Sequence, residues 1–140
     1  MKKNRKKWNL YVVMICLILM GASIAMADLG SREADNFWFT LEPGGAKHQT
    51  GLLKKTEAGA FAIINVKTYE NNTNKPFYFR LRSGTNNQEA SALVTMAGTG
   101  IYSPAYYEDF GRVGYLYYFR IQTDSSSTGE DSYVEGLWMP

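Results

Sequence analysis

The stretch Phe77-Tyr78-Phe79-Arg80-Leu81-Arg82 is the clearest β-strand signal in this chain of 140 residues. Its residues alternate, so that two phenylalanines and a leucine point to one side while a tyrosine and two arginines point to the other. Such alternation is typical of a strand with one face in a core and one face in solvent. The stretch therefore predicts a fold built from half-buried strands.

Six further segments favour the same structure. Aromatic and β-branched residues are concentrated in them, and Gly, Asn, Ser, Thr and Pro separate them. One is polar and carries lysines, as edge strands often do. No segment keeps a sustained 3.6-residue period, and seven strands with turns between them predict an all-β fold, a single antiparallel β-sandwich over residues 28–140. The six segments are residues 36–41, 47–55 (the polar one), 60–69, 90–96, 115–122 and 133–138.

Three of these strands share one pattern at a spacing of 40 residues. Residues 37–41, 77–81 and 117–121 each read aromatic, aromatic, Phe, polar, aliphatic. A three-blade repeat is one interpretation. The segments between the copies barely match, which favours three similar core strands of a sandwich. Both interpretations predict burial of Phe39, Leu41, Phe79, Leu81, Phe119 and Ile121.

Residues 1–27 have the form of an export signal. Five basic residues and no acid precede an apolar run over residues 10–20, and Ala25-Met26-Ala27 forms an A-x-A cleavage site. We expect a signal helix of the Sec type that is cleaved after Ala27, which predicts a secreted protein. A retained membrane anchor is the alternative. A lipoprotein is excluded because Cys16 lies inside the apolar run and not at its end.

Removal of this segment changes the charge of the chain. All five bases of the segment are lost with it, which leaves 10 basic against 13 acidic residues and a net charge of −3. The basic pI therefore gives no argument for a nucleic-acid partner, and we expect contact with the membrane only through the signal segment. The one cysteine is lost as well, so the mature chain is disulfide-free. Its length suffices for one hydrophobic core but not for two.

The outward side of the predicted strands is the first candidate binding surface. By alternation Trp38, Tyr78 and Tyr118 point outward together with Arg80 and Arg120. Rings and guanidinium groups on one face can stack on sugars or meet anionic cell-wall polymers. The alternative is that these residues form cross-strand pairs that stabilise the sheet without any ligand.

The segment of residues 97–114 is the longest predicted connection and the second candidate. It carries Tyr102, Tyr106 and Tyr107 between several glycines. Long loops in compact domains are often functional, and these rings could form a platform for a sugar. A loop that packs its own rings against the sheet edge is the favoured alternative.

Catalytic constellations are weak in this sequence. His48 is the one histidine, no G-x-S-x-G motif is present, and an exposed surface histidine is the favoured interpretation. A two-carboxylate glycosidase would need a pair such as Glu108 or Asp109 with Glu135, but thirteen acids offer many such pairs. We therefore expect a protein that is not an enzyme.

A metal site also has little support. Zinc usually takes several His or Cys ligands, and the mature chain has a single candidate. Calcium could be held by Asp124, Glu130 and Asp131, although a solvated hairpin loop fits these residues better. We expect no metal and no cofactor.

Several features together resemble one family. The basic signal, the strands F-W-F-T-L, F-Y-F-R-L-R and Y-Y-F-R-I, and the ending V-E-G-L-W-M-P are similar to small secreted β-rich proteins of Gram-positive bacteria, which form an uncharacterised family with a domain of unknown function. The resemblance implies a secreted protein and carries no catalytic residues. We expect a non-enzymatic protein that binds a cell-surface or extracellular target, such as a wall polymer or a protein. The alternatives are a dedicated carbohydrate or cell-wall binding module and a bacteriocin-like antagonist.

Overall fold

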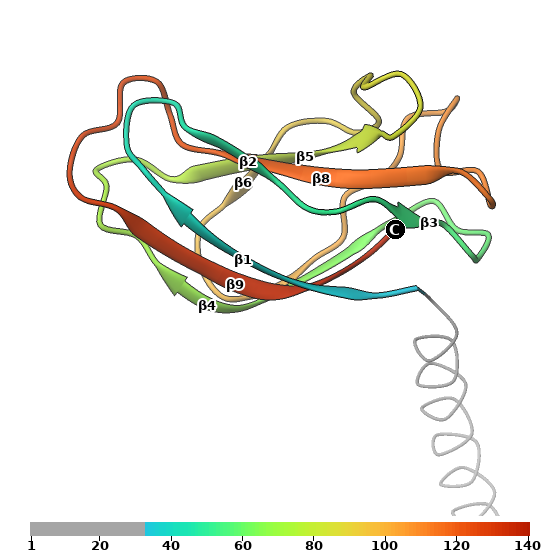
Figure 1. Cartoon of the computed structure of the whole chain (residues 1–140), viewed down its shortest axis with the longest axis horizontal. Helices are drawn as coiled ribbons and strands as arrows, with labels where there is room; N and C mark the ends of the chain where they lie inside the picture. The colour runs from blue at the N-terminus through green and yellow to red at the C-terminus, as the bar shows by residue number, and fades with distance from the viewer. Residues whose placement is uncertain (1–32) are drawn as a thin grey trace, which may run out of the picture. The chain divides into compact units, whose positions relative to one another are not determined.

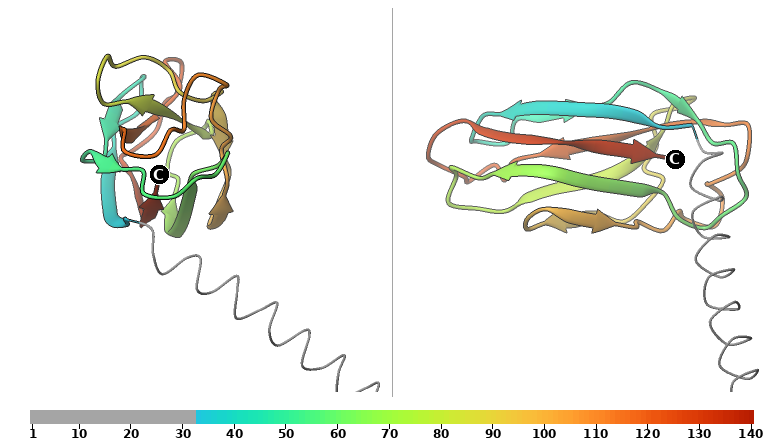
Figure 2. Two further views of the ribbon diagram at one scale, coloured as in Figure 1. Left: turned by 90° about the vertical axis from the view of Figure 1, so that its right-hand side faces the viewer. Right: turned by 90° about the horizontal axis from the view of Figure 1, so that it is seen from below.

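Two antiparallel β-sheets stacked face to face make up the computed structural model, which describes residues 33–140 (Figures 1 and 2). The predicted signal segment and its cleavage residues Ala25 and Ala27 lie outside the described residues. No described residue is helical. The nine strands are β1 (Asp35–Leu41), β2 (Lys47–Gln49), β3 (Leu53–Lys54), β4 (Ile63–Glu70), β5 (Phe77–Ser83), β6 (Val94–Met96), β7 (Gly100–Tyr102), β8 (Leu116–Gln122) and β9 (Ser132–Met139).

The strands divide between the sheets in a crossed order. The first sheet has the order β1-β9-β4-β7, and the second has the order β2-β8-β5-β6, with β3 pairing the same strand β8 as β2 does. Every neighbouring pair is antiparallel. This arrangement confirms the prediction of an all-β fold and an antiparallel sandwich.

The strand count differs from the prediction at two places. The polar segment 47–55 forms two short strands because the chain leaves β8 at residues 50–52 and returns at Leu53. The expected long loop contains β7, which pairs with Ile64, Asn65 and Val66 on β4. Three residues that begin with a glycine at φ 135° show no alternation, so the sequence gave no signal for β7.

The three similar strands are not blades of a repeat. β1 belongs to the first sheet, whereas β5 and β8 are neighbours in the second. Their shared pattern reflects a shared environment, since each has one face in the core. Of the six residues predicted to be buried, five are fully buried and Phe39 is partly buried, because β1 lies at the edge of its sheet.

Aromatic rings join the two sheets in the core. Phe119 on β8 lies 4.8 Å from Phe37 and 5.9 Å from Trp138, both in the first sheet, measured between ring centroids. Phe79, its neighbour in the second sheet, lies 6.2 Å away. The rings meet edge to face, the geometry that aromatic pairs prefer. Phe119 is therefore a central contact between the layers.

A glycine allows β1 and β9 to pack closely. Gly136 lies opposite Phe37, and a Cβ atom at this position would lie 2.8 Å from the Phe37 ring and 2.2 Å from the backbone oxygen of Asn65 on β4. The Phe37 ring thus occupies the space of the missing side chain. Such pairing of an aromatic residue with a glycine helps to set the register of a sheet.

Candidate functional site

The outer side of the second sheet carries a group of basic and aromatic side chains, which we call the arginine face. Inward residues of β5 and β8 are buried, so their alternating neighbours point outward. The register places Arg80 directly opposite Arg120 and Arg82 opposite Tyr118. The arginine face consists of Lys47, Gln49, Tyr78, Arg80, Arg82, Tyr118, Arg120 and Gln122.

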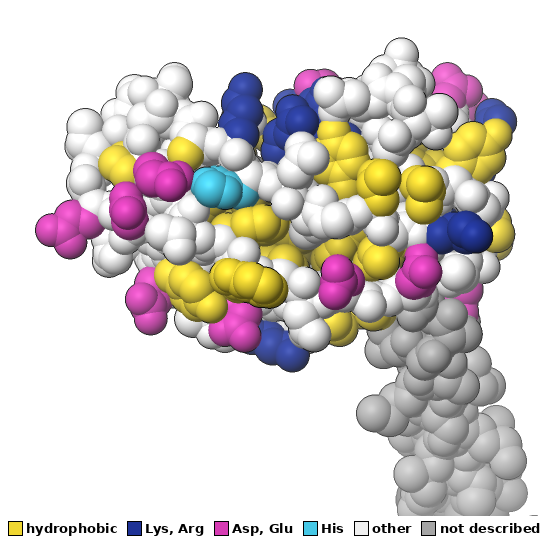
Figure 3. Space-filling view, viewed as in Figure 1, with side chains coloured by type: hydrophobic (Ala, Val, Ile, Leu, Met, Phe, Trp, Pro, Cys, Tyr) yellow, Lys and Arg dark blue, Asp and Glu magenta, His cyan; other side chains and the backbone are white. Residues whose placement is uncertain are grey.

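Positive charge on this face exceeds negative charge. Residues 33–140 hold 9 basic and 12 acidic residues, yet four of the basic ones lie on the arginine face. Glu89 pairs with Arg80 and lies 3.8 Å from the guanidinium of Arg82, and it is the one carboxylate in residues 33–140 that forms ion pairs with the face. In Figure 3 the Lys and Arg side chains gather above β2 and β5. The face is basic on a domain that is acidic overall.

Arg120 has neutral neighbours. Its guanidinium donates to the Gln49 Oε1 atom at 3.0 Å and to the Tyr118 hydroxyl at 3.4 Å, and within residues 33–140 it has no carboxylate partner. Arg80 lies directly across from it. Like charges opposite one another in a sheet are destabilising, so a bound anion between Arg80 and Arg120 would relieve that repulsion.

The loop after β5 holds the other end of the face in place. Asn87 has a φ of 57°, and its side-chain oxygen accepts hydrogen bonds from Arg82 Nε at 3.0 Å and from the Tyr118 hydroxyl. Its backbone oxygen accepts a second bond from Arg82. Asn tolerates left-handed backbone conformations, which explains its presence here. Arg82 is therefore oriented by the loop, whereas Arg120 remains available to a ligand.

The predicted aromatic component of this face needs correction. Trp38 belongs to β1, so it lies on the outer side of the first sheet and does not share a face with Tyr78 and Tyr118. Tyr118 is 6% exposed because Asn87 bonds its hydroxyl and Arg120 lies over its ring, 5.8 Å from the centroid. Strand alternation alone cannot assign a strand to one of two sheets, nor detect a neighbour that covers a ring. Tyr78 is the aromatic residue of the face that remains half-exposed.

A hollow of about 440 Å³ adjoins the arginine face beside Tyr78. Tyr78 and Leu93 supply apolar surface to it, and Lys47 lies at its rim. Asp124 also lines the hollow, and the Ser126 side chain and backbone N–H hold the pKa of its carboxyl below the ordinary value. The hollow and the arginines together form an extended surface of rings, cations and hydrogen-bonding groups.

The tyrosines of the 97–114 segment do not form a common platform. The Tyr102 hydroxyl donates to the backbone oxygen of Gly98 at 2.9 Å, and its ring meets Phe79 edge to face. The Tyr106 ring packs on Tyr117 at 4.9 Å and also lies 4.9 Å from the Nζ atom of the buried Lys55. Tyr107 is exposed. The first two rings thus pack against the sandwich, as the self-packing alternative describes.

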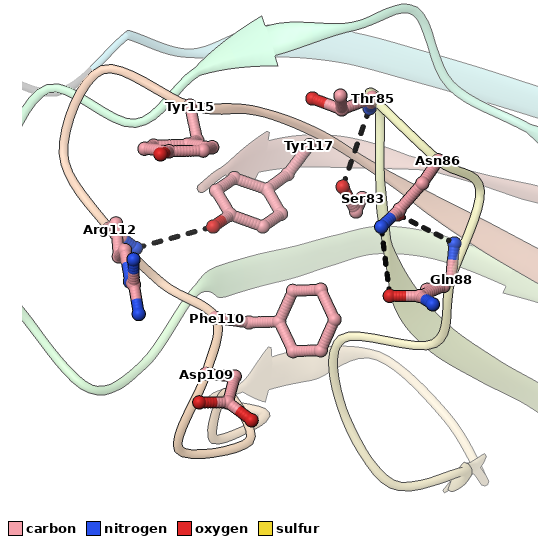
Figure 4. A pocket seen from close by; sticks show the side chains of 9 residues that line it. All are labelled: Ser83, Thr85, Asn86, Gln88, Asp109, Phe110, Arg112, Tyr115 and Tyr117. Atoms are coloured by element: carbon pink, nitrogen blue, oxygen red, sulfur yellow. Dashed lines mark hydrogen bonds between the residues drawn. The ribbon is translucent and has the colours of Figure 1, made fainter.

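A second cavity lies under the same segment at the end of β8 (Figure 4). It has a volume of about 220 Å³, and the Tyr117 hydroxyl accepts hydrogen bonds from the backbone N–H groups of Gly111 and Arg112 at 2.8 and 3.2 Å. Asp109 and the polar residues after β5 line its other side. These bonds tie the segment to the second sheet, which is a structural role.

The residues considered for catalysis lie apart. His48 Nε2 is 3.0 Å from Glu42 Oε2, and this hydrogen bond lowers the pKa of the Glu42 carboxyl. Glu135 lies on the outer side of the first sheet, where it accepts from Thr68, while Asp109 lines the cavity beside β8. The structure therefore does not bring the proposed carboxylate pair into one cleft.

Metal ligands and membrane spans were sought in the described part of the chain. No group of three or more His, Cys, Asp and Glu side chains in residues 33–140 is arranged to hold a metal ion. Asp124 instead accepts hydrogen bonds from the backbone and hydroxyl of Ser126. The same residues contain no helix of the length and apolar character needed to cross a membrane.

Comparison of the chain with protein-family models, with curated proteins and with solved structures gives no match. The argument for function therefore rests on the chemistry of the arginine face.

Proposed function

We propose that this protein is a secreted, non-enzymatic binding domain whose arginine face takes an anionic polymer of the cell surface. The observation that carries the proposal is the Arg80–Arg120 pair, two like charges held opposite each other with a single carboxylate, Glu89, nearby. Guanidinium groups recognise phosphate and carboxylate groups through paired N–H donors. Phosphate or uronate units of a wall polymer supply such groups.

The hollow beside Tyr78 supports the polymeric nature of the ligand. A half-exposed ring, an exposed leucine and amide groups suit the sugar or polyol units between the charges of a wall polymer. A small anion would need only the arginines. The surface from Arg82 to the hollow is continuous along β5, so successive units of one chain can lie on it.

The test is co-sedimentation of a chain from Asp28 to Pro140 with peptidoglycan sacculi that carry their phosphodiester wall polymers. The same sacculi after removal of those polymers with hydrofluoric acid serve as the matched surface. We expect retention on the first preparation, weakening as NaCl rises, because salt screens exposed charges. Equal retention on both preparations, or none on either, would refute the proposal.

Matched variants locate the binding surface. Arg120→Gln and Arg80→Gln should each weaken retention roughly tenfold, the effect of losing one or two charge-assisted hydrogen bonds. Lys67→Gln and Lys75→Gln make the same change of charge at positions outside the arginine face and should leave retention unchanged. If all four variants lose retention equally, binding depends on net charge and not on this face.

A further inference from the structure

β1 is an unusually open sheet edge. It is a seven-residue edge strand, whereas the edge strands β2, β6 and β7 have three residues each. In an antiparallel pair every second residue directs its N–H and C=O groups away from the partner strand. Within residues 33–140, the backbone of β1 makes no hydrogen bond on the side away from β9. A row of peptide groups is therefore open to another strand.

The usual devices that protect an edge are missing from β1. Sheet edges are commonly blocked by lysine, proline or a β-bulge. The sequence Asp35–Leu41 contains neither lysine nor proline, and its register with β9 is continuous. By contrast, β2 begins with Lys47. The open edge is thus a feature of β1 in particular.

Apolar surface accompanies this edge. A groove of about 260 Å³ runs between β1 and residues 49–51, and Phe37, Trp38 and Phe39 contribute to its wall. Figure 3 views this side of the sandwich and shows hydrophobic side chains between β1 and β2. Trp38 is 71% exposed, the highest value for any large hydrophobic residue in the described part of the chain. Exposed apolar surface of this kind marks interaction sites.

The sequence of β1 is complementary to itself. The five residues Asn36-Phe37-Trp38-Phe39-Thr40 read polar, Phe, Trp, Phe, polar in both directions. In antiparallel pairing centred on Trp38, each Phe37 would face Phe39 of a second copy toward the core side, and the two Trp38 rings would meet on the outer side. An unrelated peptide has no reason to match both sides of the strand in this way.

We propose that β1 pairs antiparallel with β1 of a second copy of this chain and joins two first sheets into one continuous eight-stranded sheet. Such contact is a self-complementary interface with two-fold symmetry. The pairing satisfies the open peptide groups and covers Trp38.

The symmetry has a consequence for the arginine face, which rests on the proposed function. The two-fold axis of an antiparallel strand pair is perpendicular to the sheet, so both copies present their second sheets on the same side. Two arginine faces then point toward one surface. A polymer or wall that contacts both is held by avidity, without any new contact within either site.

The first experiment is sedimentation-velocity ultracentrifugation of the chain from Asp28, which retains every described strand, between about 1 and about 100 µM, a range that resolves micromolar dissociation constants. We expect a monomer–dimer equilibrium. Trp38→Lys should weaken the dimer at least ~10-fold because two ammonium groups would face each other. Ile101→Lys is the matched control, since Ile101 is 70% exposed on β7, the other edge of the same sheet, and should leave the dimer intact.

Mixing variants tests the register itself. Trp38→Lys and Trp38→Glu proteins should each be largely monomeric, and an equimolar mixture should dimerise again because opposite charges then meet at the symmetry axis. A wild type that is monomeric up to about 100 µM overturns the proposal, as does a Trp38→Lys protein that dimerises like the wild type. Both results leave the proposed function intact, because wall binding is measured separately through Arg80 and Arg120.

Discussion

Replacement of Gly136 by alanine tests the arrangement of the first sheet. Gly136 lies in the middle of β9, between β1 and β4, and the Phe37 ring occupies the space where a side chain would lie. An added Cβ atom would lie 2.2 Å from the Asn65 backbone oxygen and 2.8 Å from the Phe37 ring. Real Cβ atoms do not approach other atoms this closely, so both neighbouring strands have to shift.

The expected cost follows from what has to move. Insertion of one methyl group into a packed core costs typically about 1–3 kcal/mol when side chains can adjust. Here the nearest atom belongs to the backbone of a paired strand, so we expect Gly136→Ala to lower the free energy of unfolding by about 3 kcal/mol or more. Since a domain of this size has a total stability of about 5–15 kcal/mol, the loss should be readily measured.

Urea unfolding of the chain from Asp28, followed by tryptophan fluorescence, gives the free energy of unfolding. Gly98→Ala is the matched control: its added Cβ atom would meet nothing within 4 Å, and we expect a change within about 0.5 kcal/mol. If Gly136→Ala is as stable as Gly98→Ala, then β9 is not packed between β1 and β4 in this register, and the reasoning is refuted.

Two further predictions concern the core and the edge. Phe119→Leu should lower the free energy of unfolding by about 2 kcal/mol because edge-to-face contacts with rings of both sheets are lost, whereas Phe61→Leu, at a position that is 52% exposed, should have little effect; equal losses in the same urea assay would contradict the central place of Phe119. NMR titration should show the pKa of Glu42 below its ordinary value of 4.5 because His48 hydrogen-bonds its carboxylate, and His48→Gln should raise it toward that value. Since a lowered pKa in the folded state favours folding at higher pH, this contribution is present above about pH 4.5 and is lost as the pH falls through the lowered pKa. An unchanged Glu42 pKa in the variant would show that the hydrogen bond does not act on this carboxylate.

Strand alternation accounts for most of the fold that could be predicted. The pattern of residues 77–82 correctly separates buried Phe77, Phe79 and Leu81 from outward Tyr78, Arg80 and Arg82, because the two sides of a strand differ in solvent exposure wherever the sheet has one face in a core. The short strand β7 could not be predicted, since three residues held by pairing with β4 carry no periodic signal.

The candidate site was only partly accessible in the same way. The sequence indicated that Arg80 and Arg120 point outward, and it placed Trp38 with them by the same alternation. It could not show that β1 belongs to the other sheet, because sheet membership is decided by pairing between residues distant in the chain. Nor could it show that Asn87 and Arg120 cover Tyr118, since Asn87 lies on a loop 31 residues away.

Local patterning by itself determined that this chain is all-β, which residues of each strand are apolar and which are polar, and that a basic, apolar segment precedes the domain. These properties depend on neighbours in the sequence, so they can be read without a structure. Tertiary structure alone decided that Arg80 and Arg120 lie opposite each other, that Phe37 fills the space at Gly136, and that β1 is an open edge. Each of these depends on the register and order of strands, which are set by packing of the whole core rather than by any one segment.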